Sequence, residues 1–485
     1  MNILDAVFLQ AALDPLRPAV AYPGGLATYG MLARSANNVA ANLLALGIRE
    51  RQVCAIRIPD PLLHLLVVMG LGRIGAASLS LSDTKPIDTH GLEVTASFVS
   101  ERLTGDPIDR VLVIDDRFYR DASSSCLFAD SIKGYQGAPG DLVSLCLSSG
   151  STGRPKGVPL TNAILAQRMS NPFGRGPEAR ILSMMGFDVM GGFSSAVATL
   201  RTGGLVCFAP RGPLVLEMAS FFAVTDLIAS PAQLLMLLEE QRERARNLPA
   251  LRSIVIGGAQ LPAEAQLDAE RLFSARVMIA YGSTEAGAIT LAPSTLAAPG
   301  ARTCGYVMPW LDVEVVTDDG GPLPVGAEGH IRIRGPGVVS AYYRPEPNDD
   351  EVFRHGWFHP GDLGNFDAAG LLHVTGRVGT RINRGGVKIV PESIETVLMT
   401  HPQVADCAVA ALQTSDGSVR IVAAIVPRGA MPGADALAAF CRERIPDRVP
   451  DAFVAIDAIP KTSMGKVARE ALGVSIRELH AEAPR

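Results

Sequence analysis

Lysine is rare in this chain, which carries six lysines among 44 basic residues. Because arginine is a planar fork whereas lysine is a compact point charge, some charge-stabilised sites accept only lysine. Four of the six lie in glycine-containing segments that have the composition of a ligand site: Lys156, Lys388, Lys461 and Lys466. These segments are therefore the first candidates for phosphate chemistry.

The segment around Lys156 has the composition of an anion-binding loop. It combines three glycines, four hydroxyl groups and a lysine in ten residues: Ser148-Ser149-Gly150-Ser151-Thr152-Gly153-Arg154-Pro155-Lys156-Gly157. We expect it to follow a strand at Val143–Leu147 and to precede a helix at Thr161–Met169, with amides and hydroxyls facing an anion. It is not a Walker A loop, because Pro155 stands where that motif needs glycine. The alternative is a flexible surface loop, against which the closing Pro-Lys-Gly argues.

Four later segments carry the aromatic rings, carboxylates and lysines that would complete a nucleotide site. They are Tyr281-Gly282-Ser283-Thr284-Glu285, Trp357-Phe358-His359-Pro360-Gly361-Asp362, Gly376-Arg377-Val378-Gly379-Thr380-Arg381-Ile382 continuing through Gly385-Gly386-Val387-Lys388, and Pro460-Lys461-Thr462-Ser463-Met464-Gly465-Lys466. Taken singly, each has a structural alternative, such as a β-turn or a solvated terminal lysine. Together, in this order, the five segments resemble the motifs of the adenylate-forming superfamily of acyl- and aryl-CoA synthetases, peptide-synthetase adenylation domains and luciferases.

This resemblance implies a role for each segment in binding ATP. The loop from Ser148 to Lys156 would wrap the β- and γ-phosphates, Tyr281 would stack on adenine, and Thr284 would contact the α-phosphate. Glu285 would coordinate Mg²⁺, a hard cation that prefers carboxylate and phosphate oxygens. The other residues expected beside the nucleotide are Gly258, Ala259, Gly282 and Ser283.

The same resemblance assigns the ribose and the catalytic charge. Asp362 would accept the two ribose hydroxyls, which suits a group with two acceptor oxygens, and Arg377 would contact ribose or phosphate. Lys466 would be the catalytic lysine, because a point charge between an attacking carboxylate and the α-phosphate offsets their repulsion. In the family the small domain then rotates about a hinge, here at Thr380, and presents the loop near Gly385-Gly386 to an incoming pantetheine thiol.

The acyl pocket is implied, also by resemblance, at Phe187, Asp188, Gly192, Ala280 and Gly287. Many acyl- and aryl-CoA synthetases have Phe-His-x-x-Gly at the first of these positions, whereas this chain has Asp188 in place of the histidine. Peptide-synthetase adenylation domains carry Asp there and bind the substrate's α-amino group with it. Two hypotheses stay open: a CoA ligase with a variant gate, which the glycines after Asp188 favour, and an amino-acid substrate paired with Asp188.

Three further departures concern the ribose motif and the hinge. Pro360 replaces the usual Thr, Thr380 replaces Asp or Lys at the hinge, and Ser393 replaces Glu. They motivate a third hypothesis, a non-catalytic nucleotide-binding or interaction protein, against which the intact set of Lys466, Glu285 and Asp362 argues.

The periodicity of the chain predicts an α/β protein with two domains. Strands and helices alternate from 141 to about 290, which favours a largely parallel sheet covered by helices. Short strands between 305 and 375 suggest a small β-subdomain. With the resemblance, we expect a large N-terminal AMP-binding domain at 1–379 and a small, mobile α+β domain at 380–485.

Composition limits the partners. A net charge of −5 and a pI near 6.0 argue against nucleic acid. The longest apolar stretch, Leu62–Leu81, contains His64 and Arg73, so we expect no integral membrane association. Seven scattered cysteines without a CxxC pair indicate a reduced, cytoplasmic chain. The expected partners are a small carboxylic acid, ATP with Mg²⁺, and CoA or, alternatively, an acyl or peptidyl carrier protein.

Overall fold

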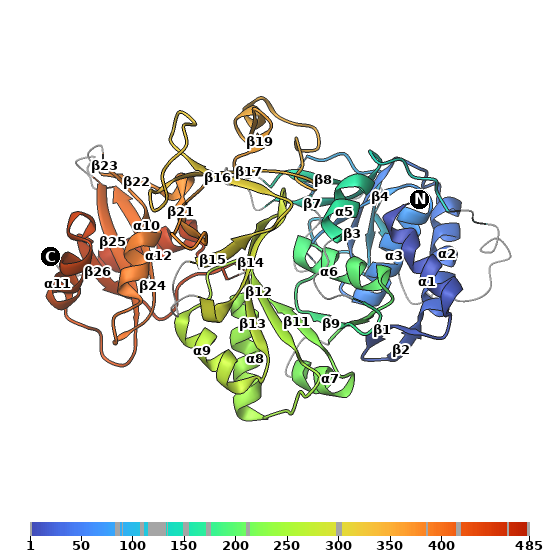
Figure 1. Cartoon of the computed structure of the whole chain (residues 1–485), viewed down its shortest axis with the longest axis horizontal. Coiled ribbons are helices and arrows are strands. Elements are labelled where there is room, and N and C mark those ends of the chain that lie inside the picture. Colours follow the sequence, from blue (N-terminus) through green and yellow to red (C-terminus); the bar gives the residue numbers. More distant parts are fainter. Residues whose placement is uncertain are drawn as a thin grey trace.

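The computed structural model describes residues 2–82, 88–89, 91–106, 111–114, 132, 134–148, 155–170, 176–209, 214–296, 303–384, 387–413, 419–462 and 465–482. They form a large N-terminal body and a smaller C-terminal body, which Figure 1 draws in orange and red. Of the helices in this part of the chain, none combines the length and the apolarity needed to cross a bilayer.

The first sheet of the large body has six strands in the order β6-β5-β3-β4-β7-β8. They are β3 (Val53–Arg57), β4 (Ala77–Ser80), β5 (Ala96–Val99), β6 (Val111–Val113), β7 (Leu142–Leu147) and β8 (Gly157–Thr161). Only the pair β7–β8 is antiparallel. The helices on this part are α1 (Ala6–Leu13), α2 (Tyr29–Ala45) and α3 (Pro61–Arg73). Helix α3 is apolar all round and buried, as expected inside a large core.

The segment 148–157 leads into a strand, β8, where we expected a helix. Residues Val158 and Leu160 are buried in β8, which pairs with β7, so the segment closes a β-hairpin instead of leading directly into a helix. A strand forms here in place of a helix, because alternate residues of a strand point to the same face and these two apolar side chains complete that face of the sheet. Helix α5 (Asn162–Met169) begins after β8, and the Thr161 side chain accepts a hydrogen bond from the Ile164 amide at 3.3 Å, which is the predicted N-cap.

A second sheet of the large body combines two strands from the start of the chain with strands that follow residue 180, and it carries most of the candidate site. Its strands are β1 (Pro18–Tyr22), β2 (Gly25–Thr28), β9 (Arg180–Ser183), β10 (Leu205–Cys207), β11 (Asp226–Ala229), β12 (Ser253–Gly257), β13 (Arg276–Ser283) and β14 (Gly287–Pro293). The run β1-β10-β9-β11-β12-β13 is parallel, with antiparallel strands at both ends. Its helices are α6 (Met190–Arg201), α7 (Val215–Phe221), α8 (Pro231–Glu243) and α9 (Ala263–Leu272). Helices α7, α8 and α9 cover one face, where Ile254 and Ile256 join their apolar core.

The predicted β-subdomain continues the path of this sheet beyond β14. It contains β15 (Thr303–Val307), β16 (Asp312–Val316), β17 (Gly329–Arg334), β18 (Phe353–Arg354), β19 (Trp357–Phe358), β20 (Asp362–Phe366) and β21 (Leu372–Arg377). All its pairs are antiparallel. The short strands expected between 305 and 375 are confirmed.

The C-terminal body is built on a three-stranded sheet, β24-β25-β26. Its elements are η5 (Val378–Thr380), β22 (Ile382–Arg384), β23 (Val387–Ile389), α10 (Pro391–Leu398), β24 (Val404–Gln413), β25 (Val419–Pro427), α11 (Ala434–Arg444), β26 (Ala452–Ala455) and α12 (Arg469–Glu482). Because neighbouring strand residues face opposite sides, two cores form: one under α10 and α11, the other under α12. The α/β fold with a large and a small body is therefore confirmed. The predicted boundary at 379 lies within η5 and stays a prediction.

Candidate active site

One cavity of about 1780 Å³ is lined by residues from the large body and by Lys466 from the C-terminal body. Ligand pockets commonly measure roughly 300–1,000 Å³, so this cavity has room for more than one small molecule. Its lining contains many of the predicted site residues: Ser148, Asp188, Gly258, Ala280, Tyr281, Gly282, Ser283, Thr284, Glu285, Gly287, Arg377 and Lys466. The segments that carry them are far apart in the chain, so the fold brings the motifs together.

The hairpin between β13 and β14 presents Tyr281, Thr284 and Glu285 to the cavity. Its two glycines are required by geometry. A Cβ at Gly282 would lie 2.3 Å from the Gly287 carbonyl oxygen, and Gly287 itself has φ +72°. The sequence Tyr-Gly therefore permits a close turn that a larger residue would force apart.

Tyr281, Asp362 and Arg377 form a hydrogen-bonded cluster at the edge of the cavity. The Tyr281 hydroxyl donates to Asp362 Oδ2 at 2.6 Å, and Arg377 Nε donates to Oδ1 at 2.7 Å. Asp362 is 3% exposed, and burial together with this carboxylate raises the pKa of Tyr281. Each carboxylate oxygen has a second lone pair, so the cluster can still accept a ligand hydroxyl.

Glu285 is buried and accepts a hydrogen bond from the Tyr342 hydroxyl at 2.9 Å through Oε1. Among the described residues no group of three or more His, Cys, Asp or Glu side chains could hold a metal. A single cavity-lining carboxylate fits Mg²⁺ when nucleotide phosphates supply other oxygen ligands, which is how Mg²⁺ is usually bound at phosphate sites.

Lys466 reaches the cavity on a tight turn after β26. The Thr462 amide donates to the Lys466 carbonyl at 2.8 Å, and Gly465 has φ +81°. A Cβ at Gly465 would lie 3.5 Å from Ala232 in the first turn of α8, so the turn rests on the large body. Burial and the positive charge of Arg377 lower the pKa of Lys466, while Asp362 and Glu285 act in the opposite direction. The ammonium group therefore lies within electrostatic reach of all three.

Arg168 holds the Tyr281–Glu285 turn in place, and sequence reasoning missed it. Its guanidinium donates to the carbonyls of Gly337, Thr284 and Glu285 at 2.8, 3.1 and 2.6 Å. Burial lowers its pKa to about 10. In sequence it is a basic residue in the last turn of α5, for which a helix-dipole partner is the ordinary interpretation. No sequence signal distinguishes the buried role.

The phosphate loop is described only at its ends. Residues 149–154, which include the predicted Ser149, Gly150, Ser151, Thr152 and Gly153, lie outside the described residues. At the ends, the Lys156 amide donates to Ser148 Oγ at 3.1 Å, and the Lys156 ammonium pairs with Asp349 and lies 5.3 Å from the Tyr342 ring centroid. A nucleotide phosphate would therefore compete with Asp349 for this lysine.

The acyl side of the cavity is only partly as expected. Asp188, Ala280 and Gly287 line it. Phe187 lies outside this lining, is buried, and stacks on His64 at 4.9 Å. Gly192 also lies outside it, and it packs so closely on the chain that a Cβ there would be 2.2 Å from the Gly186 carbonyl oxygen. Ala259 likewise falls outside the lining, next to Gly258.

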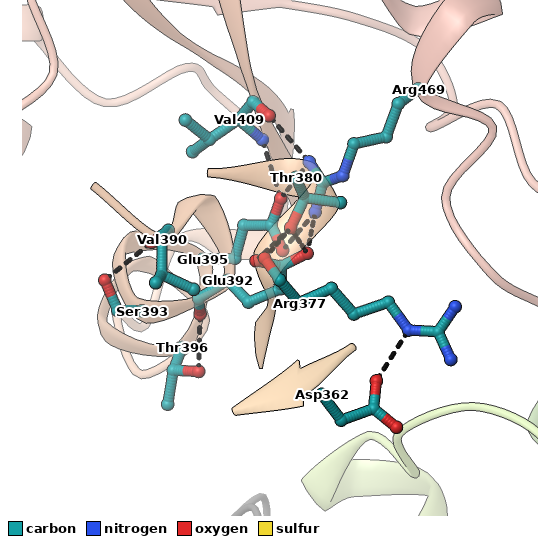
Figure 2. A network of polar contacts seen from close by, with 10 residues as sticks. All are labelled: Asp362, Arg377, Thr380, Val390, Glu392, Ser393, Glu395, Thr396, Val409 and Arg469. Atoms are coloured by element: carbon teal, nitrogen blue, oxygen red, sulfur yellow. Dashed lines mark hydrogen bonds and ion pairs between the residues drawn. The ribbon is translucent and has the colours of Figure 1, made fainter. Parts of the chain in front are cut away.

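A polar network links the predicted hinge to the segment after Lys466 (Figure 2). Thr380 Oγ1 donates to the Glu392 carboxylate at 3.0 Å, and Arg469 pairs with Glu392 at 2.7 Å and with Glu395 at 2.9 Å. Arg469 also donates to the Val409 carbonyl at 2.7 Å. Arg377 connects the hinge to Asp362 in the same view.

The two hinge-region residues that depart from the family pattern, Thr380 and Ser393, both form hydrogen bonds with nearby residues. Thr380 bonds Glu392, and Ser393 donates to the Val390 carbonyl at 2.7 Å. Gly385 and Gly386, expected to meet the thiol, lie outside the described residues.

Comparisons with known proteins agree with the motifs. The model of the family described as AMP-binding enzyme matches residues 7–343, and that of the AMP-binding enzyme C-terminal domain matches residues 393–466. The chain is 27% identical to an indoleacetate–CoA ligase of Aromatoleum aromaticum over 97% of both chains. It is 28% identical to a linear gramicidin synthase of Brevibacillus parabrevis, over 96% of this chain and 9% of that protein.

The fold is similar to that of a solved structure. ATP-bound MatB from Rhodopseudomonas palustris superposes with a TM-score of 0.86 at 23% identity, covering 99% of this chain and 100% of that one. At this identity the likeness concerns the fold.

Proposed function

The chain belongs to the AMP-binding enzyme family, as an acid–thiol ligase that forms AMP, and on that premise we propose that it is an acyl- or aryl-CoA synthetase. The observation that supports this most strongly is the convergence of Lys466, Glu285 and Arg377 on one cavity, with Asp362 hydrogen-bonded to Arg377 beside it. These charges come from both bodies of the molecule.

In the first half-reaction a carboxylate oxygen of the acid attacks the α-phosphorus of ATP. A bond forms between that oxygen and phosphorus, the bond to pyrophosphate breaks, and an acyl-adenylate remains. Two anions must meet, so the Lys466 ammonium offsets their repulsion and stabilises the charge that develops on the α-phosphate. Tyr281 packs the adenine, and Asp362 with Arg377 holds the ribose. When bound through Glu285, Mg²⁺ supplies further neutralisation of phosphate charge.

In the second half-reaction the CoA thiolate attacks the acyl carbon, a thioester forms and AMP leaves. Lys466 occupies the cavity in this arrangement of the two bodies, so we propose that the C-terminal body turns about Thr380 before the thiol enters. The turn that carries Gly465 and Lys466 comes close to Ala232 of α8, and such a movement would separate the two.

The experiment that tests this function is a screen of acids with ATP and Mg²⁺, with and without CoA. Fatty, aromatic, dicarboxylic and amino acids should each be tested for pyrophosphate release and for the acyl-CoA product. We expect acid-dependent pyrophosphate release, and an acyl-CoA that forms in step with AMP. The absence of acid-dependent pyrophosphate release with every class would contradict the proposal.

A second candidate function is the loading of a carrier protein, with an amino acid as the substrate. Asp188 favours it, because this carboxylate lines the cavity where a substrate ammonium group would lie. In that case CoA would be inert, and the carrier's pantetheine would be required. The substitution Asp188→Ala should then reduce kcat/KM for amino acids selectively. An equal effect on acids without an amino group would remove this candidate.

A further inference from the structure

The sheet face on the acyl side of the cavity is not closed by packing. In β12 the burial alternates: Ile254 and Ile256 are buried against α8 and α9, whereas Ser253, Val255 and Gly257 remain partly exposed. A central strand of a parallel sheet is usually covered on both faces. Here the second face borders the cavity, since these three residues line it.

The register of the neighbouring strands turns this alternation into three rows across the sheet. Gly257 pairs with Ala280 in a row of small residues beside the Tyr281 turn. Two residues earlier in each strand, Val255 pairs with Met278 and with Ile228, an apolar row.

The third row lies a further two residues towards the start of each strand. Here Ser253 pairs with Arg276 and with Asp226, which makes a polar row. The Ser253 hydroxyl donates to Asp226 at 2.5 Å. All three rows line the same cavity. The surface therefore changes from small to apolar to polar with distance from the nucleotide.

A second wall is formed by Val189 and by helix α6. Met190, Ser194 and Ala198 of α6 line the cavity at spacings of four residues, so one stripe of this helix faces it. Helix α6 packs on β9 and β10, which leaves the face of β11, β12 and β13 beside the cavity. A channel therefore runs between this helix and the three strands.

The length of the channel is set by strand geometry. From Ala280 to Arg276 is four residues, which at a rise of about 3.3 Å per residue is roughly 13 Å. Arg276 and Arg252 at the far end are exposed, so the channel opens to solvent there. A short acid would fill only the row of small residues and would leave the apolar row in contact with water.

We propose that the acid activated by this enzyme is an extended one, whose apolar body lies along Ile228, Val255 and Met278 and whose far end reaches the polar opening at Arg276. This inference rests on the proposed function and names the class of acid for the same site. Burying a methylene against such a surface increases affinity about fourfold. Selectivity should therefore rise with chain length and stop rising once the acid spans the channel.

The test is kcat/KM for pyrophosphate release with straight-chain monocarboxylic acids from acetate upward, at fixed ATP and Mg²⁺. The wild-type enzyme should gain about fourfold for each added methylene and should level off when the chain spans ~13 Å. Preference for the shortest acids, or no dependence on length, would overturn the channel. If no acid of any length releases pyrophosphate, the proposed function itself fails.

Two substitutions then locate the chain in the channel. Val255→Trp should lower the ratio of kcat/KM for a long acid to that for a short acid by about 30-fold or more, since it fills a space worth several methylenes. Met278→Phe is a milder block in the same row. Met236→Trp, at an exposed position on α8 that is 54% exposed, is the matched control and should leave the ratio unchanged. A ratio unaltered in both channel variants, measured on folded protein, would overturn the inference.

Discussion

The two ends of the cavity are built on different principles. At the end where we propose that the nucleotide binds, Tyr281, the cross-strand pair Asp362–Arg377 and Lys466 come from three separate parts of the chain and are joined by hydrogen bonds and charges. At the acyl end, Gly257, Val255 and Ser253 with their neighbours come from adjacent strands and differ by position along the sheet. The first end is defined by residue type, whereas the second is defined by register and by residue size.

This difference separates what each end can tolerate. A charged group that acts on phosphate has few substitutes, because its position and its charge both matter. An apolar channel tolerates exchange among residues of similar volume. We therefore expect substitutions at the nucleotide end to abolish the reaction, and substitutions at the acyl end to change which acid is used.

The largest effect is expected at Lys466. Lys466→Ala should lower the rate of acid-dependent pyrophosphate release by about 10²–10³, because it removes a charge that stabilises the transition state. Thiolysis of supplied acyl-adenylate by CoA should be affected much less. The matched control lies in the same motif: Lys461 is paired with Asp406 within the C-terminal body, outside the cavity lining. Lys461→Ala should keep nearly full activity, and equal losses in the two variants would contradict the assignment.

A second large effect is expected at Arg168, and it tests whether the residue that holds the Thr284–Glu285 turn matters for the reaction as well as for stability. Arg168→Met should lower the free energy of unfolding by about 1–3 kcal/mol for each buried carbonyl that loses its donor. It should also slow pyrophosphate release by up to about 100-fold, since the Thr284–Glu285 turn would shift. Denaturant unfolding and initial rates measure the two effects.

The control for Arg168 is Arg201→Met, which removes a single hydrogen bond to the Met169 carbonyl at 3.1 Å. This variant should keep the wild-type rate. An Arg168 variant that loses stability at an unchanged rate would show that the residue has a structural role alone.

The sequence predicted most of the fold, and the assignment of residues to the nucleotide stays a prediction. Periodicity predicted the alternating strands and helices after residue 141 and the short strands between 305 and 375, and the adenylate motifs were confirmed as a family assignment. It missed β8, because the strand is short and directly follows the glycine-rich loop. It also missed Arg168, since its role depends on three carbonyls that only the folded chain brings together. The channel was out of reach for the same reason: the rows arise from the register of separate strands.

A smaller effect is expected at the hinge. Thr380→Val keeps the shape but removes the hydroxyl that bonds Glu392, so the arrangement with Lys466 in the cavity should become less favoured. Pyrophosphate release should fall relative to thiolysis of supplied acyl-adenylate by about tenfold, the scale of one hydrogen bond to a charged group. Thr380→Ser should restore the ratio. Thr396→Val is the control, because Thr396 donates to the Glu392 backbone carbonyl at 2.8 Å, away from the hinge. Equal ratios in Thr380→Val and wild type would exclude a role for this bond.

The smallest effect is a displacement of the pH profile. Burial and Arg377 hold the pKa of Lys466 below the ordinary 10.5. The lysine acts as a cation, so pyrophosphate release should be lost as pH rises through this lowered pKa. Arg377→Gln removes a like charge and should move the alkaline limb upward, whereas Asp362→Asn removes an opposite charge and should move it downward. Identical limbs in both variants would contradict the electrostatic link.

The central claim is that Lys466 must lie in the cavity for adenylation and must leave it before the thiol reacts. A Cβ at Gly465 would lie 3.5 Å from the Ala232 Cβ, a separation at which disulfides form. The six cysteines of the described chain form no disulfide, so the double variant Ala232→Cys/Gly465→Cys introduces the relevant pair. Oxidised, it should release about one pyrophosphate per active site without making acyl-CoA, and reduction should restore acyl-CoA formation. Sustained acyl-CoA synthesis by the cross-linked enzyme, or loss of its adenylation, would contradict the account.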